Sequence, residues 1–172
     1  GLTAALGAIS DVPITLGADN AIGALSSRIE GTVDLDPSLT LSTQLDRLSG
    51  ARDLGVSTGT INFSYNGGPT AQIDLSGADT IGDVADIIEA AIIQYETDNT
   101  VSILGPGGVG ISGGSLSFDI AGGGNLDFTD PQGSYVGADL GLVQNPAVPF
   151  TTASNTGLDL DPRLAWTTPI TA

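Results

Sequence analysis

One short sequence occurs twice in this chain, and its recurrence restricts the possible folds more than any other feature. Residues 34–45 read DLDPSLTLSTQL, and residues 159–170 read DLDPRLAWTTPI. A weaker likeness joins residues 3–13 to residues 137–149, where Leu-Gly pairs recur. Internal similarity at a fixed spacing is typical of consecutive units with the same fold. We therefore expect four parts: the end of a preceding repeat unit in residues 1–32, a complete unit in 33–142, a linker in 143–157 and the start of a following unit in 158–172.

Residues 59–75 have the pattern of a β-hairpin. Apolar side chains alternate along residues 59–65 and again along 70–75, which favours two half-buried strands. Between them lies Asn66-Gly67, a pair that suits a turn with positive φ.

An amphipathic helix is expected to follow over about residues 80–95. Thr80 and Asp83 have the spacing of a capping box, which satisfies the first free N–H groups of a helix. Beyond them, apolar residues recur every three or four positions, and this stripe is expected to pack on the hairpin: Ile81, Val84, Ile87, Ile88, Ala91 and Ile92.

The remainder of the unit indicates short elements separated by glycines. A short helix is expected between Thr43 and Gly50, short strands between residues 101 and 128, and one helical turn at 136–140. The predicted fold class is α+β, with short antiparallel β-sheets, one main amphipathic helix at about 80–95 and a β-rich C-terminal part with glycine turns.

The composition excludes many kinds of active site. The chain has 20 acidic and 4 basic residues, a formal net charge of −16, and neither His nor Cys. All four basic residues are arginines, so there is no lysine for a Schiff base or a P-loop. The usual nucleophile–base pairs and zinc ligands are missing. A strongly acidic chain repels nucleic acid and anionic lipid, and no apolar run is long enough to span a membrane. We predict that the protein is not an enzyme.

The repeated acidic pairs are the candidate metal ligands. Asp34 and Asp36, and again Asp159 and Asp161, offer carboxylate oxygens of the kind that Ca²⁺ prefers. The alternative is a turn, because Asp before Pro favours turn initiation. A pair of catalytic carboxylates in a glycan hydrolase is a third reading. No cofactor is expected, with Ca²⁺ as the one possible ion. The GxGxxG pattern at residues 105–110 is not expected to bind a nucleotide, because no helix of the required kind follows it and the next residues favour a strand.

Residues 59–84 resemble a known sequence motif. Gly59-Thr60-Ile61-Asn62, the hairpin and Asp79-Thr80-Ile81-Gly82-Asp83-Val84 look like the "IN" motif of flagellins and hook-associated proteins. The flanking DLDPxL sequence and the closing GADLGL at 137–142 resemble units repeated in tandem in long hook-associated-like proteins. The resemblance covers about residues 33–142. It implies an extracellular structural module on a bacterial surface filament or flagellum-like appendage.

The sequence thus predicts a module that assembles with copies of itself or with other filament subunits. The C-terminal segment 158–172 is expected to complete the N-terminal partial unit of a neighbouring molecule, which gives an open filament. A fragment of a longer tandem array is the simpler interpretation of the same ends. The alternative function is a Ca²⁺-dependent adhesion or carbohydrate-binding module. The residues expected at the interface are Leu158, Leu160, Leu164, Trp166 and Ile170.

Overall fold

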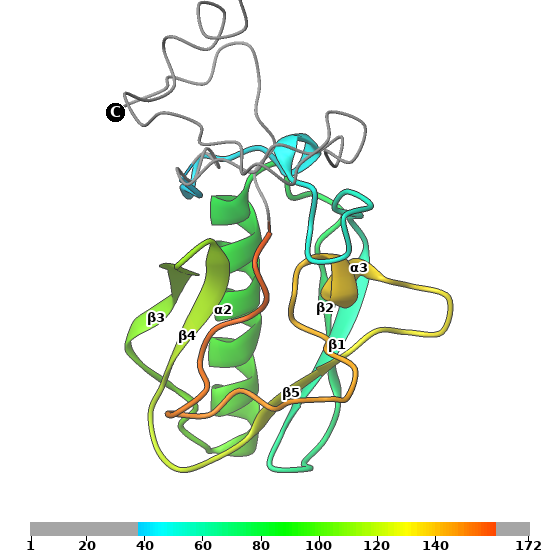
Figure 1. The fold of residues 1–172 in the computed structure, drawn as a ribbon. Coiled ribbons are helices and arrows are strands. Elements are labelled where there is room, and N and C mark those ends of the chain that lie inside the picture. Colours follow the sequence, from blue (N-terminus) through cyan, green and yellow to red (C-terminus); the bar gives the residue numbers. More distant parts are fainter. Residues whose placement is uncertain (1–37, 161–172) are drawn as a thin grey trace, which may run out of the picture. The chain divides into compact units, whose positions relative to one another are not determined.

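The computed structural model describes residues 38–160, which contain one main helix and two small antiparallel sheets (Figure 1). The predicted α+β class is confirmed. The elements in chain order are the 3₁₀ helix η2 (Leu45–Arg47), β1 (Thr60–Tyr65), β2 (Ala71–Asp74), α2 (Ile81–Asn99), β3 (Leu104–Ser112), β4 (Ser115–Ile120), β5 (Leu126–Thr129) and the short helix α3 (Val136–Asp139).

Helix α2 begins where the capping box predicts. The Thr80 hydroxyl accepts from the N–H of Asp83 at 3.2 Å, and the Asp83 carboxylate accepts from the N–H of Thr80 at 2.8 Å. Hydrogen bonds from the Thr80 hydroxyl and then from the N–H groups of Thr80 and Asp79 lower the pKa of Asp83 below its ordinary value. The helix start is therefore fixed by local chemistry.

Helix α2 is one turn longer than its apolar stripe predicts. The stripe ends near Tyr95, whereas the helix continues to Asn99. Polar side chains bond along the last turn: the Thr97 hydroxyl donates to the carbonyl of Ile93, and the Asn99 amide donates to that of Tyr95. These bonds need no apolar partner, so hydrophobic periodicity does not reveal them.

The predicted hairpin is present and belongs to a three-stranded sheet of order β2-β1-β5. Strand β1 pairs antiparallel with β2, placing Ile61 opposite Ile73, and with β5, placing Phe63 opposite Phe128. Ile61, Phe63, Ile73 and Phe128 are all buried, so one face of this sheet closes the core.

Strands β3 and β4 form the second sheet, which lies against α2. The sequence predicts separate short strands here, but β3 is continuous across the glycine-rich stretch, with an irregularity between Leu104 and Val109. Carboxylates of α2 accept N–H groups of β3: Glu96 accepts from Leu104 at 2.7 Å, and Glu89 accepts from Val109 at 2.8 Å. The GxGxxG stretch thus lies within β3, whereas the sequence predicts a glycine turn at residues 105–108 between two strands.

Residues 150–160, here named the crossing segment, join the two sheets (orange to red in Figure 1). At one end, Phe150 exchanges two backbone hydrogen bonds with Leu126 of β5, at 2.8 and 2.9 Å. Farther along, the N–H of Phe118 in β4 donates to the carbonyl of Asn155, and the N–H of Gly157 donates to that of Leu116, both at 2.8 Å. The crossing segment is therefore paired with both sheets.

This pairing corrects the expected boundaries of the unit. Residues 143–157 were expected to be a linker, yet Phe150 is buried in the same core as α2 and Val143 packs against that core. Residues 158–160, expected to begin the next unit, are bonded to this one. Pro, Asn and Thr dominate the stretch, but one buried phenyl ring and backbone pairing are enough to bind it to the sheets.

The core is aliphatic around α2 and aromatic between the sheets. All four phenylalanines are buried. Phe118 of β4 contacts Phe128 of β5 with ring centroids 5.4 Å apart, and it contacts Phe150 at 4.7 Å. These rings join the three-stranded sheet, the hairpin β3–β4 and the crossing segment into one packed core.

Candidate functional site: the junction of the two chain ends

Both ends of the described unit meet at Gly50. The first copy of the repeated sequence leads through η2 to Gly50, whose N–H donates to the carbonyl of Leu160 at 2.9 Å. Leu160 belongs to the second copy, and its own N–H donates to the carbonyl of Gly114 at 3.0 Å. The start of the second copy is thus bonded to the chain five residues beyond the end of the first copy.

The end of the crossing segment is packed closely against Gly141, two residues beyond the end of α3. The N–H of Leu158 donates to the carbonyl of Gly141 at 3.0 Å. Gly141 has φ +70°, and a Cβ there would lie 2.7 Å from the carbonyl oxygen of Leu158. Only glycine combines this backbone conformation with so close an approach. The Leu-Gly pair that recurs in the weaker repeat therefore has a structural role at this junction.

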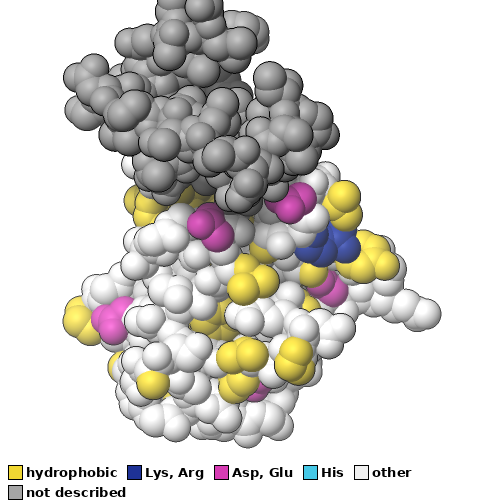
Figure 2. Space-filling model, in the orientation of Figure 1, with side chains coloured by type: hydrophobic (Ala, Val, Ile, Leu, Met, Phe, Trp, Pro, Cys, Tyr) yellow, Lys and Arg dark blue, Asp and Glu magenta, His cyan; other side chains and the backbone are white. Residues whose placement is uncertain are grey.

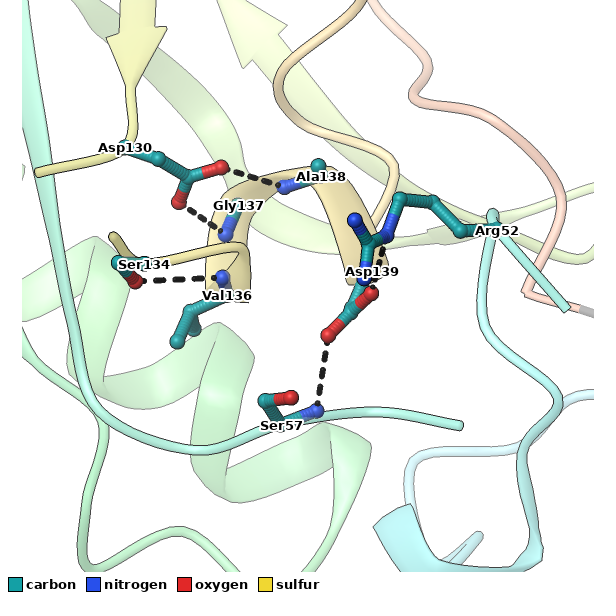
Figure 3. A network of polar contacts seen from close by, with 8 residues as sticks. All are labelled: Arg52, Ser57, Asp130, Ser134, Val136, Gly137, Ala138 and Asp139. Atoms are coloured by element: carbon teal, nitrogen blue, oxygen red, sulfur yellow. Dashed lines mark hydrogen bonds and ion pairs between the residues drawn. The ribbon is translucent and has the colours of Figure 1, made fainter. Parts of the chain in front are cut away.

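A buried ion pair fixes the turn at residues 50–55 to α3 (Figure 3). Asp139 is only 1% exposed, and its carboxylate accepts from Nε of Arg52 at 2.7 Å and from the N–H of Ser57 at 3.3 Å. The carbonyl of Asp139 accepts from the N–H of Ala51 at 2.9 Å. A carboxylate this deeply buried needs such partners, because leaving it unpaired costs several kcal/mol.

A second carboxylate orients α3 itself. Asp130 accepts from the N–H groups of Gly137 and Ala138 at 2.7 and 3.0 Å, and the Ser134 hydroxyl lies 3.4 Å from the N–H of Val136 (Figure 3). These bonds satisfy the first donors of a very short helix. They place Asp139 where it meets Arg52.

Arg52 of this network also belongs to an exposed surface, together with Tyr135 and Leu54. The Arg52 guanidinium lies over the ring of Tyr135, 4.3 Å from its centroid, and Tyr135 is 58% exposed. Leu54, on the same turn as Arg52, is 74% exposed. Figure 2 shows basic side chains bordered by hydrophobic ones on this face. Arginine, tyrosine and an exposed aliphatic side chain are typical of protein interfaces.

The predicted interface residues differ in exposure, and only two of them lie within the described residues. Leu158 is 42% exposed and remains accessible. Leu160 is buried in the core of its own unit. In this conformation its side chain cannot contact a neighbouring molecule. Leu164, Trp166 and Ile170 lie outside the described residues.

Of the four predicted metal ligands, only Asp159 lies within the described residues. It is exposed, and its carboxylate lies beside Gly114, at which a Cβ would come within 2.6 Å of an Asp159 oxygen. Asp34, Asp36 and Asp161 lie outside the described part. Between residues 38 and 160 no group of three or more acidic side chains is arranged to hold a metal ion.

Two shallow hollows are found on the described unit. One, of about 310 Å³, is bordered by the glycines of β3, by Asp119 and by Asn155 and Thr156. Asp119 is already bonded to the N–H of Gly107 at 2.8 Å. The other, of about 280 Å³, lies between β2 and α2 beside Tyr95. Neither hollow brings charged groups together in the manner of a catalytic site.

Sequence reasoning did not identify Arg52, Tyr135 or Asp139 as partners. Arg52 and Asp139 are 87 positions apart, and no motif connects them. The one signal in the sequence was charge: an arginine in so acidic a chain is rare enough to examine for a buried acidic partner.

Comparison with family models, with curated proteins and with solved structures finds no match for this chain. In residues 38–160 no helix has both the length and the apolar character needed to cross a membrane. The described residues form an α+β unit in which Gly50, near the start, is bonded to Leu160 at the end.

Proposed function

We propose that this protein is an extracellular structural module that assembles with copies of itself or with other subunits of a bacterial surface filament. It works by contact between surfaces, without catalysis. The observation that supports this most directly is the place of the repeated sequence: the end of the first copy is built into the described unit at Leu45, and the start of the second copy is built into it at Leu160.

The junction gives this proposal a mechanical basis. A loose linker lets neighbouring modules move independently, whereas a start segment bonded to the preceding unit restrains the next one. Leu158 and Leu160 make backbone bonds to Gly141, Gly114 and Gly50. Consecutive modules joined in this way form a stiff array, which suits a filament or its decoration.

The exposed surface around Arg52, Leu54 and Tyr135 gives the proposal a lateral contact. In a chain with a net charge of −16, contacts between copies bring acidic surfaces together. Because Asp139 already neutralises Arg52, this surface adds the apolar area of Leu54 and Tyr135 without adding negative charge. It therefore meets an acidic partner, such as a second copy, with less repulsion than a surface of acidic side chains does.

The test is the state of association of the full chain. Light scattering coupled to gel filtration, and negative-stain electron microscopy, are applied over a wide range of concentrations and at low and high salt. We expect particles larger than one chain that increase with concentration. A single mass equal to one chain under every condition, with no polymers on the grid, refutes self-assembly.

A further inference from the structure

The first copy of the repeat is held to the start of α2 by main-chain groups. Gln44 forms an antiparallel bridge with Thr80: the N–H of Leu45 donates to the carbonyl of Asp79, and the N–H of Ile81 donates to that of Thr43, both at 3.0 Å. Such bonds depend on backbone shape and not on side-chain identity. Any segment with the right shape can make them.

The start of α2 also supplies donors that the helix cannot satisfy. The N–H of Gly82 donates to the carbonyl of Leu41 at 2.7 Å, and a Cβ at Gly82 would lie 2.9 Å from that oxygen. The first N–H groups of any helix lack partners within it. Residues 79–82 therefore form a docking site for a turn followed by a single bridge residue, the shape that residues 41–45 have.

Side-chain requirements at this docking site are few. Leu45 is buried and fills the core, whereas Leu41 is 49% exposed and tolerates a larger group. The Thr43 hydroxyl accepts from the N–H of Thr40 at 3.0 Å, which shapes the turn before the bridge. A matching segment therefore needs an aliphatic residue at the position of Leu45 and a threonine at the position of Thr43.

The second copy of the repeat meets each requirement. Aligned on DLDP, it places Trp166 at the position of Leu41, Thr168 at that of Thr43 and Ile170 at that of Leu45. Thr40 becomes alanine, which keeps the two main-chain groups that bond to Thr43 and loses the hydroxyl contacts with Ser42 and Thr43.

Proline in the second copy is compatible with the docked geometry. Pro169 aligns with Gln44, which has φ −73° and ψ 141°. Proline adopts this φ without strain. The bridge uses the N–H of Leu45 and not that of Gln44, so the missing proline N–H costs no hydrogen bond there.

The differences between the copies favour the second one at this site. Proline reduces the conformational freedom that docking removes, and tryptophan covers more apolar surface than leucine. Arg163 replaces Ser38 and makes the second copy less negative toward a helix start that bears Asp79 and Asp83.

We propose that residues 164–170 of one molecule dock on residues 79–82 of a second copy, in the place that residues 39–45 of the first repeat copy occupy in the structure. This inference rests on the proposed self-assembly and identifies the site at which it occurs. The exchange conserves the backbone bonds, so it resembles domain swapping. Because the donor segment and the acceptor site are different parts of the chain, each copy offers its segment to the next, and the contacts extend into a linear polymer when the rotation between copies does not close a ring.

The chain contains a built-in probe of this contact, since Trp166 is its only tryptophan. Fluorescence of the full chain is recorded over the concentration range in which mass is measured by analytical ultracentrifugation. We expect the emission to shift to shorter wavelength as the mass increases, because docking removes part of the indole from water. A shift that is independent of concentration, in a single-chain species, places the segment in its own unit and overturns the proposal.

Two matched variants separate this contact from association in general. Ile170→Asp places a charge where Leu45 is buried, and association is expected to weaken about 10- to 100-fold. Thr167→Asp adds the same charge at the position of Ser42, which is exposed, and is expected to associate like the parent chain. If both variants polymerise equally, the docking contact is wrong while self-assembly stands. If the parent chain never associates, the proposed function fails as well.

Discussion

Replacing Phe150 with alanine tests whether the crossing segment is part of the fold. The Phe150 ring is buried and contacts two other rings, Phe118 at 4.7 Å and Phe128 at 5.6 Å between centroids. Removing a fully buried phenyl group typically costs about 3–5 kcal/mol. A residue in an exposed linker would cost about 0.5 kcal/mol or less. We therefore expect Phe150→Ala to lower the free energy of unfolding by about 4 kcal/mol.

Urea unfolding followed by far-ultraviolet circular dichroism measures this difference. With a denaturant slope of about 2 kcal/mol per molar urea, the midpoint is expected to fall by about 2 M. Val148→Ala is the matched control, because Val148 lies just before the crossing segment and its side chain is exposed. If Phe150→Ala unfolds within about 0.5 kcal/mol of the Val148 variant, the ring does not hold the two sheets together.

Three further predictions concern the charges. Arg52→Ala leaves buried Asp139 without its ion-pair partner and is expected to lower the free energy of unfolding in urea by about 1–3 kcal/mol. Arg47→Ala, at an exposed position, is the control and should change this free energy little. Equal effects of the two variants would contradict the ion pair with Asp139. Because hydrogen bonds from Thr80 lower the pKa of Asp83, its contribution is complete above its ordinary pKa of 3.8 and is lost as the pH falls through the lowered value. The difference in melting temperature between the parent chain and Asp83→Asn should therefore shrink below about pH 3.8, and a gap that stays constant to pH 2 would exclude this linkage. Adding EDTA should leave the melting temperature unchanged, whereas a fall that added Ca²⁺ reverses would favour the Ca²⁺-dependent adhesion module.

The hairpin and the start of α2 could be predicted because their signals are local. Asn66-Gly67 selects a tight turn, and the Thr80–Asp83 box bonds residues three apart. Such interactions join residues that are close in the sequence, so a short stretch is enough to predict them. The α+β class follows from them, since one amphipathic helix beside alternating strands must bury its apolar stripe against a sheet.

The crossing segment could not be predicted because its partners are distant in sequence. Its hydrogen bonds to β4 and β5 join main-chain groups, which leave no pattern of side chains. Any rule based on composition predicts a linker at residues 143–157, because the stretch is rich in prolines and polar residues. Only Phe150 departs from that composition, and one aromatic residue is too weak a signal to assign a strand.

The candidate site divides in the same way. The repeated DLDPxL sequence identified one of the segments at the junction, residues 159–160, and it supplied the alignment on which the docking proposal depends. The ion pair between Arg52 and Asp139 emerged only from the fold, because α3 and the turn at residues 50–55 are brought together by the sheets.

The sequence alone determined the elements whose free energy comes from neighbours a few residues away: the capped helix, the tight hairpin and the recurrence of one segment. The tertiary structure decided which residues close the core, which arginine is paired, and that the second repeat copy begins inside the unit. Those choices depend on burial and on backbone pairing between distant segments, and both arise only when the whole chain excludes water together.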